Sequence, residues 1–138
     1  MSEFINVDKI DFNKLLGRKP NHVNNDNSYK FLHNKQIIIT GGCGSIGSEV
    51  VKQLLYLGIN NLHIIDNSEC STFNLRNEID KLFPMNAVKL YLRDINNIGR
   101  VKILFNEIQP NIVFHAAAYK HVPIMESNPH ESIKVNII

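Results

Sequence analysis

The sequence contains only two cysteines and no long apolar run, and these absences exclude several classes of protein. Cys43 and Cys70 lack the spacing of paired metal ligands and are too few to cross-link a small secreted fold. No segment approaches the roughly 20 apolar residues of a membrane-spanning helix. Glu3 stands where a signal peptide carries basic residues, and no long apolar region follows it. We therefore expect a cytoplasmic protein with reduced cysteines and no membrane span.

The net charge is only +2, from 15 Lys and Arg residues against 13 Asp and Glu residues. Because nonspecific binding to a phosphate backbone needs a clear basic excess, nucleic acid is not expected as a partner. With 43% hydrophobic residues, the 138 residues can bury one modest core. We interpret residues 1–34 as a polar extension with a short helix that begins near Asp11 and ends at Gly17. Residues 35–138 form one predicted domain, which we expect to be incomplete at its carboxyl end.

Short β-branched runs alternate with helical patterns throughout this predicted domain. Such alternation is typical of βαβ units and predicts an α/β fold with a doubly wound parallel sheet of Rossmann type. About four strands are expected, at residues 36–40, 61–66, 87–92 and 111–115.

Helical patterns separate the predicted strands. The first covers residues 45–57, and its apolar residues at helical spacing are Ile46, Val50, Leu54 and Leu57. The second and third patterns are closed by Pro84 and Pro110, because proline cannot continue a helix. A fourth helix is expected to begin at Asn128-Pro129, with asparagine as the N-cap and proline as the first helical residue.

A glycine-rich turn joins the first predicted strand to the first predicted helix. It reads Thr-Gly-Gly-Cys-Gly-Ser-Ile-Gly over residues 40–47 and fits G-x-G-x-x-G from Gly42 or G-x-x-G-x-x-G from Gly41. In both readings the first glycine makes the turn, Gly44 lets the backbone approach the phosphates of a dinucleotide, and Gly47 lets helix and strand pack closely. The free N–H groups and positive dipole at the start of the helix favour an anion there. The motif therefore predicts a nucleotide-binding turn rather than a merely flexible loop.

Asp66 ends the second predicted strand, 19 residues after Gly47, and gives the turn the context of a dinucleotide site. Its carboxylate would accept hydrogen bonds from the adenosine ribose and repel a 2′-phosphate, which favours NAD over NADP. Lysine or arginine from elsewhere could still neutralise that phosphate. In an alternative interpretation, Asp66 is a simple helix N-cap. ATP hydrolysis by a P-loop is disfavoured, because Ser45 and Ile46 stand where its Lys-Ser/Thr pair belongs.

Four segments resemble the extended short-chain dehydrogenase/reductases of polysaccharide biosynthesis. They are the glycine turn at 40–49, Asp-Asn-Ser-Glu at 66–69, Leu-Arg-Asp-Ile at 92–95 and Val-Phe-His-Ala-Ala-Ala-Tyr-Lys-His-Val-Pro-Ile-Met-Glu at 113–126. The last segment is the most specific, and it is most similar to the CapD-like UDP-N-acetylglucosamine 4,6-dehydratases. The resemblance extends from about residue 14 to the end of the chain.

This resemblance implies a lyase reaction of surface polysaccharide biosynthesis on a nucleotide-sugar substrate, with NAD or NADP as cofactor. In that reaction the cofactor takes a hydride from sugar C4, water leaves across C5 and C6, and the hydride returns to C6. The resemblance also implies cofactor contacts by position. Besides Gly41 in the turn, these are Gly44, Ser45, Ile46 and Gly47 for the pyrophosphate, Asp66, Asn67 and Ser68 for the adenosine ribose, and Asp94 and Ile95 for the adenine.

Two further parts of the resemblance concern the segment after the fourth predicted strand. Ala116, Ala117 and Ala118 would pass close to the cofactor, although simple tight packing also explains small residues there. Lys120 would face a phosphate of the cofactor or of the sugar nucleotide. In the alternative interpretation, Lys120 is only a solvated surface residue. Asn136 resembles a family asparagine in the helix that follows.

The Tyr-x-x-x-Lys pair of short-chain dehydrogenases is absent. This spacing places both side chains on one helix face, where the lysine charge lowers the tyrosine pKa. None of the four tyrosines, Tyr29, Tyr56, Tyr91 and Tyr119, has lysine four positions later. We therefore expect the NAD(P)-binding part of a dehydratase, inactive alone, with its catalytic residues in polypeptide outside this chain. The alternatives are a non-catalytic nucleotide-binding or assembly module and a fragment of a UDP-hexose epimerase.

Two expectations concern metals and assembly. No two histidines have the i, i+4 spacing that would place two ligands on one helix face, so no metal site is predicted. A parallel sheet of four strands would leave an edge and one strand face uncovered. We therefore expect a homo-oligomer, with poor solubility or disorder at the carboxyl end of the chain as the alternatives.

Overall fold

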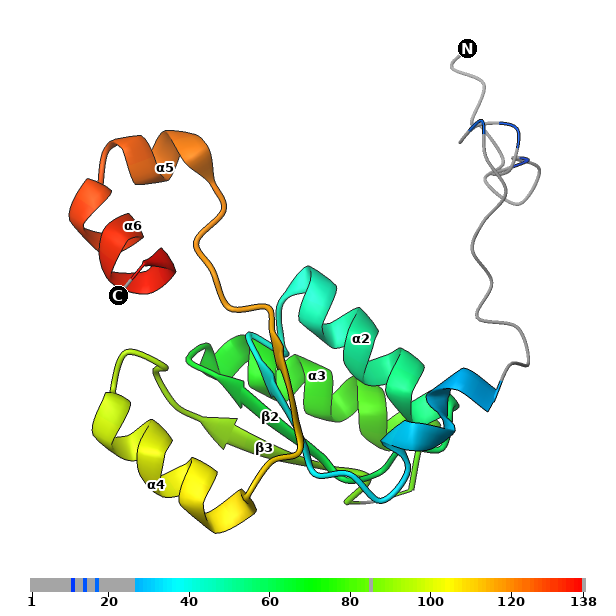
Figure 1. Ribbon diagram of the computed structural model, residues 1–138. Coiled ribbons are helices and arrows are strands. Elements are labelled where there is room, and N and C mark those ends of the chain that lie inside the picture. The colour runs from blue at the N-terminus through cyan, green and yellow to red at the C-terminus, as the bar shows by residue number, and fades with distance from the viewer. Residues whose placement is uncertain (1–10, 12–13, 15–16, 18–26, 85, 138) are drawn as a thin grey trace.

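A computed structural model describes residues 11, 14, 17, 27–84 and 86–137. The described residues contain a four-stranded parallel sheet with the strand order β3-β2-β1-β4 (Figure 1). Each strand begins one residue later than the sequence pattern predicts, and the Rossmann-type fold is confirmed. The strands are β1 at Ile37–Thr40, β2 at Leu62–Asp66, β3 at Val88–Leu92 and β4 at Ile112–His115.

The helices form a layer on each face of the sheet. Figure 1 shows α2 (Ser45–Tyr56) and α3 (Glu69–Leu82) on one face and α4 (Ile98–Ile108) on the other. The short helices α5 (Val122–Glu126) and α6 (Pro129–Asn136) lie beyond the carboxyl ends of the strands. The described helices include none that is both long and apolar enough to cross a membrane.

The predicted fourth helix is confirmed as α6, whereas two elements were not predicted. A 3-10 helix, η2, covers Asn27–Leu32, where the sequence suggested the end of a polar extension. Its Leu32 is buried in the core, and this contact explains why the segment is ordered against the domain. Helix α5 escaped prediction because it has only five residues and buries none of them.

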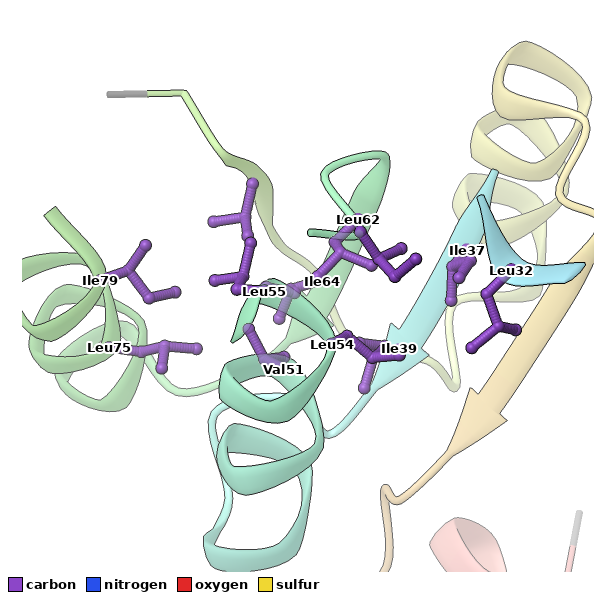
Figure 2. Packing of buried hydrophobic residues seen from close by; sticks show 12 residues of the cluster. Leu32, Ile37, Ile39, Val51, Leu54, Leu55, Leu62, Ile64, Leu75 and Ile79 are labelled. Carbon is purple, nitrogen blue, oxygen red and sulfur yellow. The ribbon is translucent and has the colours of Figure 1, made fainter. Parts of the chain in front are cut away.

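The two central strands, β1 and β2, bury both faces, as expected for a parallel sheet between helices. Alternate residues such as Ile37, Ile39, Leu62 and Ile64 face α2 and α3 (Figure 2). Ile38 and Ile65 point the other way and pack with Leu104 of α4. Full burial of such a side chain contributes about 1.5–3 kcal/mol, so these side chains hold the carboxyl edge of the sheet in place.

The predicted inner face of α2 was partly wrong. Ile46 was expected to face the core, yet 71% of its surface is exposed. The helix instead buries Gly47, Val51, Leu54 and Leu55. The reason is that Gly47 must turn toward the glycine turn, where a side chain would not fit, and the positions four and seven residues later follow it inward.

One partly buried polar network is centred on His63. His63 of β2 is only 4% exposed, and its ring stacks on Tyr91 of β3. Its Nδ1 lies 3.1 Å from the Tyr91 hydroxyl and its Nε2 lies 2.9 Å from Oε1 of Gln36. Because an amide oxygen only accepts, Nε2 carries the proton and Nδ1 accepts from the tyrosine. Burial lowers the pKa of His63, so the neutral ring belongs to the folded state.

The predicted short helix near the amino terminus lies mostly outside the described residues. Lys14 is helical, and its backbone N–H donates to Oδ1 of Asp11 at 3.2 Å. Gly17 has a φ of 60°, a left-handed value that suits a residue at a helix end.

The strand order creates a switch point in the sheet. From β1 the chain proceeds to β2 and β3 on one side, whereas β4 returns to pair with the other side of β1. β2 and β4 therefore lie on opposite sides of β1. In open α/β sheets a ligand binds in the crevice at this point, outside the carboxyl ends of the strands.

Candidate cofactor site

A cleft of about 180 Å³ lies at the carboxyl edge of the sheet, over the switch point. It draws residues from the ends of all four strands, although these residues are far apart in the sequence. The predicted site residues that line it are Gly41, Gly44, Asp66, Asn67, Asp94, Ile95, Ala116, Ala117 and Ala118.

Backbone atoms leave no room for a side chain at two glycines of the turn after β1, for different reasons, and the buried Ile64 side chain leaves none at Gly42. Gly41 has a φ of 64°, and a Cβ on it would lie 2.6 Å from the Ala117 backbone. A Cβ on Gly47 would overlap the carbonyl oxygen of Gly41 and lie 2.6 Å from the Cα of Gly42. Gly41 therefore lets β4's exit segment approach the turn, and Gly47 lets α2 pack on it.

Gly44 differs from these two glycines. It is exposed, its φ is −73°, and the nearest atom to an added Cβ is the Gly41 carbonyl oxygen at 3.3 Å. No contact within the described residues thus demands glycine there. It is the N-cap of α2, and no side chain caps that helix end. The first N–H groups of this twelve-residue helix therefore have no side-chain acceptor, and an anion at this helix end would accept hydrogen bonds from them.

Asp66 joins the second strand to the glycine turn. Its Oδ2 accepts from the Cys43 N–H at 3.0 Å, and its Oδ1 accepts from the Ser68 N–H at 3.0 Å. A carboxylate offers about four acceptor positions, so Asp66 keeps capacity for ribose hydroxyls. The alternative interpretation of Asp66 as a helix N-cap was wrong. Ser68 is the N-cap of α3, and its hydroxyl oxygen accepts from the Ser71 N–H at 3.2 Å.

Cys43 lies in the turn between two of these glycines. Burial raises the pKa of its thiol to about 11, and the Asp66 carboxylate adds to the rise, whereas contact with the Thr72 hydroxyl opposes it. The sulfur lies 3.6 Å from that hydroxyl oxygen. The side chain is therefore a neutral thiol that packs the turn against α3, with no nucleophilic character at neutral pH.

The opposite wall of the cleft is formed by the segment after β4. The Ala116 N–H donates to the Thr40 carbonyl at 2.9 Å, which extends the ladder between β4 and β1 by one residue. The Thr40 hydroxyl lies 2.6 Å from Nδ1 of His115. These contacts hold the alanines beside the end of β1, where longer side chains would fill the cleft.

The side chain of Asn136 in α6 binds the backbone of Tyr119, the residue after the three alanines. Its Oδ1 accepts from the Tyr119 N–H at 2.9 Å, and its Nδ2 donates to the Tyr119 carbonyl at 2.9 Å. One side chain thus satisfies both backbone groups of a residue in an exposed loop, as a neighbouring strand would. Tyr119 and Val135 both line the cleft, so this pair of bonds positions its far end.

Several predicted site residues lie outside the cleft lining. Ser45 and Ile46 are exposed in the first turn of α2, and their contact with a ligand stays a prediction. Gly47 is buried, so its role in this structure is packing. The Ser68 hydroxyl is engaged by Ser71. Lys120 is exposed and lines a separate hollow between α5 and α6, so its predicted contact with a phosphate also stays a prediction.

The cleft also contains residues that sequence reasoning missed. They are Ile65, Ser71, Arg93, Asn96, Tyr119 and Val135. A usable signal existed for Arg93, because it directly precedes Asp94 at the end of a predicted strand. None existed for Val135, whose place depends on how α6 folds back. No group of metal-ligating side chains able to hold an ion occurs among residues 27–84 and 86–137 or the three isolated described positions.

Residues 37–138 match the sequence pattern of the polysaccharide biosynthesis protein family. The chain belongs to this family. It is 36% identical to the capsular polysaccharide biosynthesis protein CapD of Staphylococcus aureus over 138 residues, which are 99% of this chain and 23% of that protein. It is also 36% identical to an inverting UDP-N-acetylglucosamine 4,6-dehydratase of Campylobacter jejuni over 104 residues, 75% of this chain and 29% of that enzyme.

A solved structure supports the fold. The structure of UDP-glucose 4-epimerase from Thermus thermophilus in complex with NAD superposes with a TM-score of 0.61 at 28% identity, over 73% of this chain and 30% of that one. The resemblance to the CapD-like members of the extended short-chain dehydrogenase/reductases is thus confirmed. This family of polysaccharide biosynthesis includes nucleotide-sugar dehydratases, and the fold is shared with epimerases. The chain spans less than a third of the length of each of these three relatives.

Proposed function

We propose that residues 35–138 form the NAD(P)-binding domain of a nucleotide-sugar 4,6-dehydratase in surface polysaccharide biosynthesis, with a substrate of the UDP-N-acetylglucosamine type. The observation that carries the proposal is the cleft at the switch point, which brings the glycine turn, Asp66, Asp94 and the three alanines to one place. The dehydratase relative from Campylobacter jejuni supports the reaction type.

The cleft suits a dinucleotide in several respects. The uncapped start of α2 and the exposed Gly44 would receive the pyrophosphate. Asp66 would accept from the adenosine ribose, and Asp94, with Oδ1 already bonded to Asn96, would accept from the adenine amine. The small residues after β4 would allow the cofactor to pass. When bound, NAD(P)⁺ would accept the hydride from sugar C4 and return it to C6.

Proton transfer is a different matter, because the sequence has no Tyr-x-x-x-Lys pair. We infer that this chain binds the cofactor and that the acid and base groups come from other polypeptide. The free thiols of Cys43 and Cys70 are in keeping with a cytoplasmic protein. The half-exposed Val113 on edge strand β4 supports association with further polypeptide, a second copy included.

An epimerase scaffold is the second candidate, and the NAD-bound UDP-glucose 4-epimerase of similar fold favours it. Both reactions begin with hydride removal at C4, so both need the same cofactor cleft. The His-Ala-Ala-Ala-Tyr-Lys-His-Val-Pro block at residues 115–123 favours the dehydratase. The product would distinguish them, since a dehydratase yields a 4-keto-6-deoxy sugar and an epimerase yields the C4 epimer.

The proposal is tested by titrating the chain with NADH and NADPH and following cofactor fluorescence. The sequence has no tryptophan, so indole emission does not interfere. We expect saturable binding that Asp66→Ala weakens at least about tenfold, because hydrogen bonds to a charged group contribute about 1.5–3 kcal/mol. The matched control is Asp80→Ala, which removes an exposed carboxylate of α3 outside the cleft.

Two results would contradict this function. One is the absence of saturable dinucleotide binding by the unaltered chain. The other is conversion of UDP-N-acetylglucosamine to a 4-keto-6-deoxy product by this chain alone, because the assignment leaves it without a proton-transferring pair.

A further inference from the structure

Arg93 is the only cationic residue among those that line the cleft. It follows β3 directly, and its backbone N–H donates to the Asp66 carbonyl at 2.8 Å. Arg93 and Asp66 are therefore neighbours at the carboxyl edge, with Asn67 and Asp94 beside them in the same cleft lining. Two carboxylates and one guanidinium are the charged groups of this adenosine end.

The Arg93 guanidinium is not committed to another protein group. Its Nε is shielded from solvent and has no hydrogen-bond partner in the described structure. The ion pairs among the described residues involve Lys52 and Arg76, and Arg93 takes part in none of them. A buried N–H donor left unpaired is unfavourable, so no protein acceptor holds the guanidinium in place. Arg93 is partly exposed and lines the cleft, so an acceptor on a bound ligand would meet its outer N–H groups.

Asp66 is less of an obstacle to an anion than its charge suggests. Both of its oxygens already accept backbone N–H groups, from Cys43 and Ser68, so its charge is partly compensated by the fold. In dinucleotide folds an acidic residue at this strand end binds the ribose 2′-hydroxyl, and an arginine nearby accommodates a 2′-phosphate. This cleft contains both residue types side by side.

We propose that Arg93 sets the cofactor preference of the cleft by pairing with the 2′-phosphate of NADP(H), so that NADP(H) binds despite Asp66. The proposal rests on the proposed function, because it concerns the adenosine end of the same site. A guanidinium offers five N–H donors in a planar fork that fits a phosphate, whereas NAD(H) presents only a hydroxyl there. Arg93 would therefore stabilise bound NADP(H) more than bound NAD(H).

The test is the ratio of the dissociation constants of NADPH and NADH, measured by fluorescence titration. The unaltered chain is expected to bind the two within about tenfold of each other. Arg93→Gln should weaken NADPH binding at least about tenfold more than NADH binding, and a smaller change in the ratio overturns the proposal. Arg93→Lys keeps the charge without the planar fork and should give an intermediate ratio.

The matched control is Arg100→Gln, which removes one positive charge from exposed α4 outside the cleft lining. It should change the ratio less than about threefold, and a change as large as that of Arg93→Gln would assign the effect to general electrostatics and refute the role of Arg93. Circular dichroism and thermal melting verify that each variant is folded. If neither dinucleotide binds the unaltered chain, the proposed function fails. If NADH binds and NADPH does not, only the role of Arg93 fails.

Discussion

Two glycines of the same turn offer a test that separates folding from ligand binding. Gly44 and Gly47 lie three residues apart, at the start and in the first turn of α2. Alanine at Gly47 would place a methyl group that overlaps the Gly41 carbonyl oxygen and lies 2.6 Å from the Cα of Gly42. Both obstacles are backbone atoms, so no side-chain rotation relieves them. Alanine at Gly44 would meet only the Gly41 carbonyl oxygen, at 3.3 Å.

The expected magnitudes differ accordingly. Overpacking in a tight interior costs about 1–3 kcal/mol, and the rigid surroundings of Gly47 put Gly47→Ala near about 3 kcal/mol. For a domain of this size, that loss lowers Tm by roughly 10 °C. Gly44→Ala should lose about 0.5 kcal/mol of unfolding free energy at the N-cap and regain a similar amount because the unfolded chain is less flexible. The net change in unfolding free energy should therefore stay within about 1 kcal/mol.

Binding should follow a different order. A methyl group on Gly44 would stand where the pyrophosphate is proposed to approach the backbone, and we expect Gly44→Ala to weaken NADH binding at least about tenfold with little loss of Tm. Gly47→Ala should both weaken NADH binding and lower Tm. Differential scanning calorimetry and fluorescence titration on the same samples measure the two effects. The reasoning is refuted if Gly44→Ala binds NADH as the unaltered chain does, or if it is destabilised as much as Gly47→Ala.

Two further predictions follow from shifted pKa values. Because burial lowers the pKa of His63 below its ordinary value of 6.5, the unfolded state binds the proton first as pH falls, so unfolding free energy should decrease below about pH 6.5, by at most about 1.4 kcal/mol per pH unit. Urea midpoints at pH 7.5 and 5.5 should differ less in His63→Gln than in the unaltered chain, and equal differences would exclude His63 as the cause. Because burial raises the pKa of Cys43 to about 11 from 9.0, its thiolate fraction at pH 8 should be about 100-fold lower than that of an ordinary thiol. Iodoacetamide followed by mass spectrometry should label the exposed Cys70 first, and equally fast labelling of Cys43 would contradict its burial.

Strands were more predictable from the sequence than helix faces. A run such as Ile37-Ile38-Ile39 is buried on both sides of a parallel sheet, so its hydrophobicity alone locates it. The face of α2 depends on a contact that periodicity does not contain. Gly47 is pulled inward by the shape of the turn, and this leaves Ile46 outside although it is the larger apolar residue.

The candidate site divides in the same way. Residues at or just after strand ends, such as Asp66 and Asp94, could be placed from the sequence because parallel strands bring their carboxyl ends to one edge. Tyr119 and Val135 could not be placed, because their positions depend on α6 folding back through the Asn136 side chain. Arg93 was visible in the sequence, but its importance depends on a buried and unpaired Nε that only the packing creates.

The distribution of polar groups in the cleft implies an unequal division of binding energy along a dinucleotide. All three charged lining residues lie at the carboxyl ends of β2 and β3, where Asp66 ends β2 and Arg93 and Asp94 follow β3, whereas the segment after β4 contributes three alanines and Tyr119. A dinucleotide that spans the switch point would therefore be recognised by charge at its adenosine end and by close approach at its other end. Charged contacts would fix the orientation of the bound dinucleotide, whereas the small residues would only leave space for it. Under the proposed function, the described residues would hold the cofactor by its adenosine half, and we expect further polypeptide to contribute the groups that position the nicotinamide ring and the sugar.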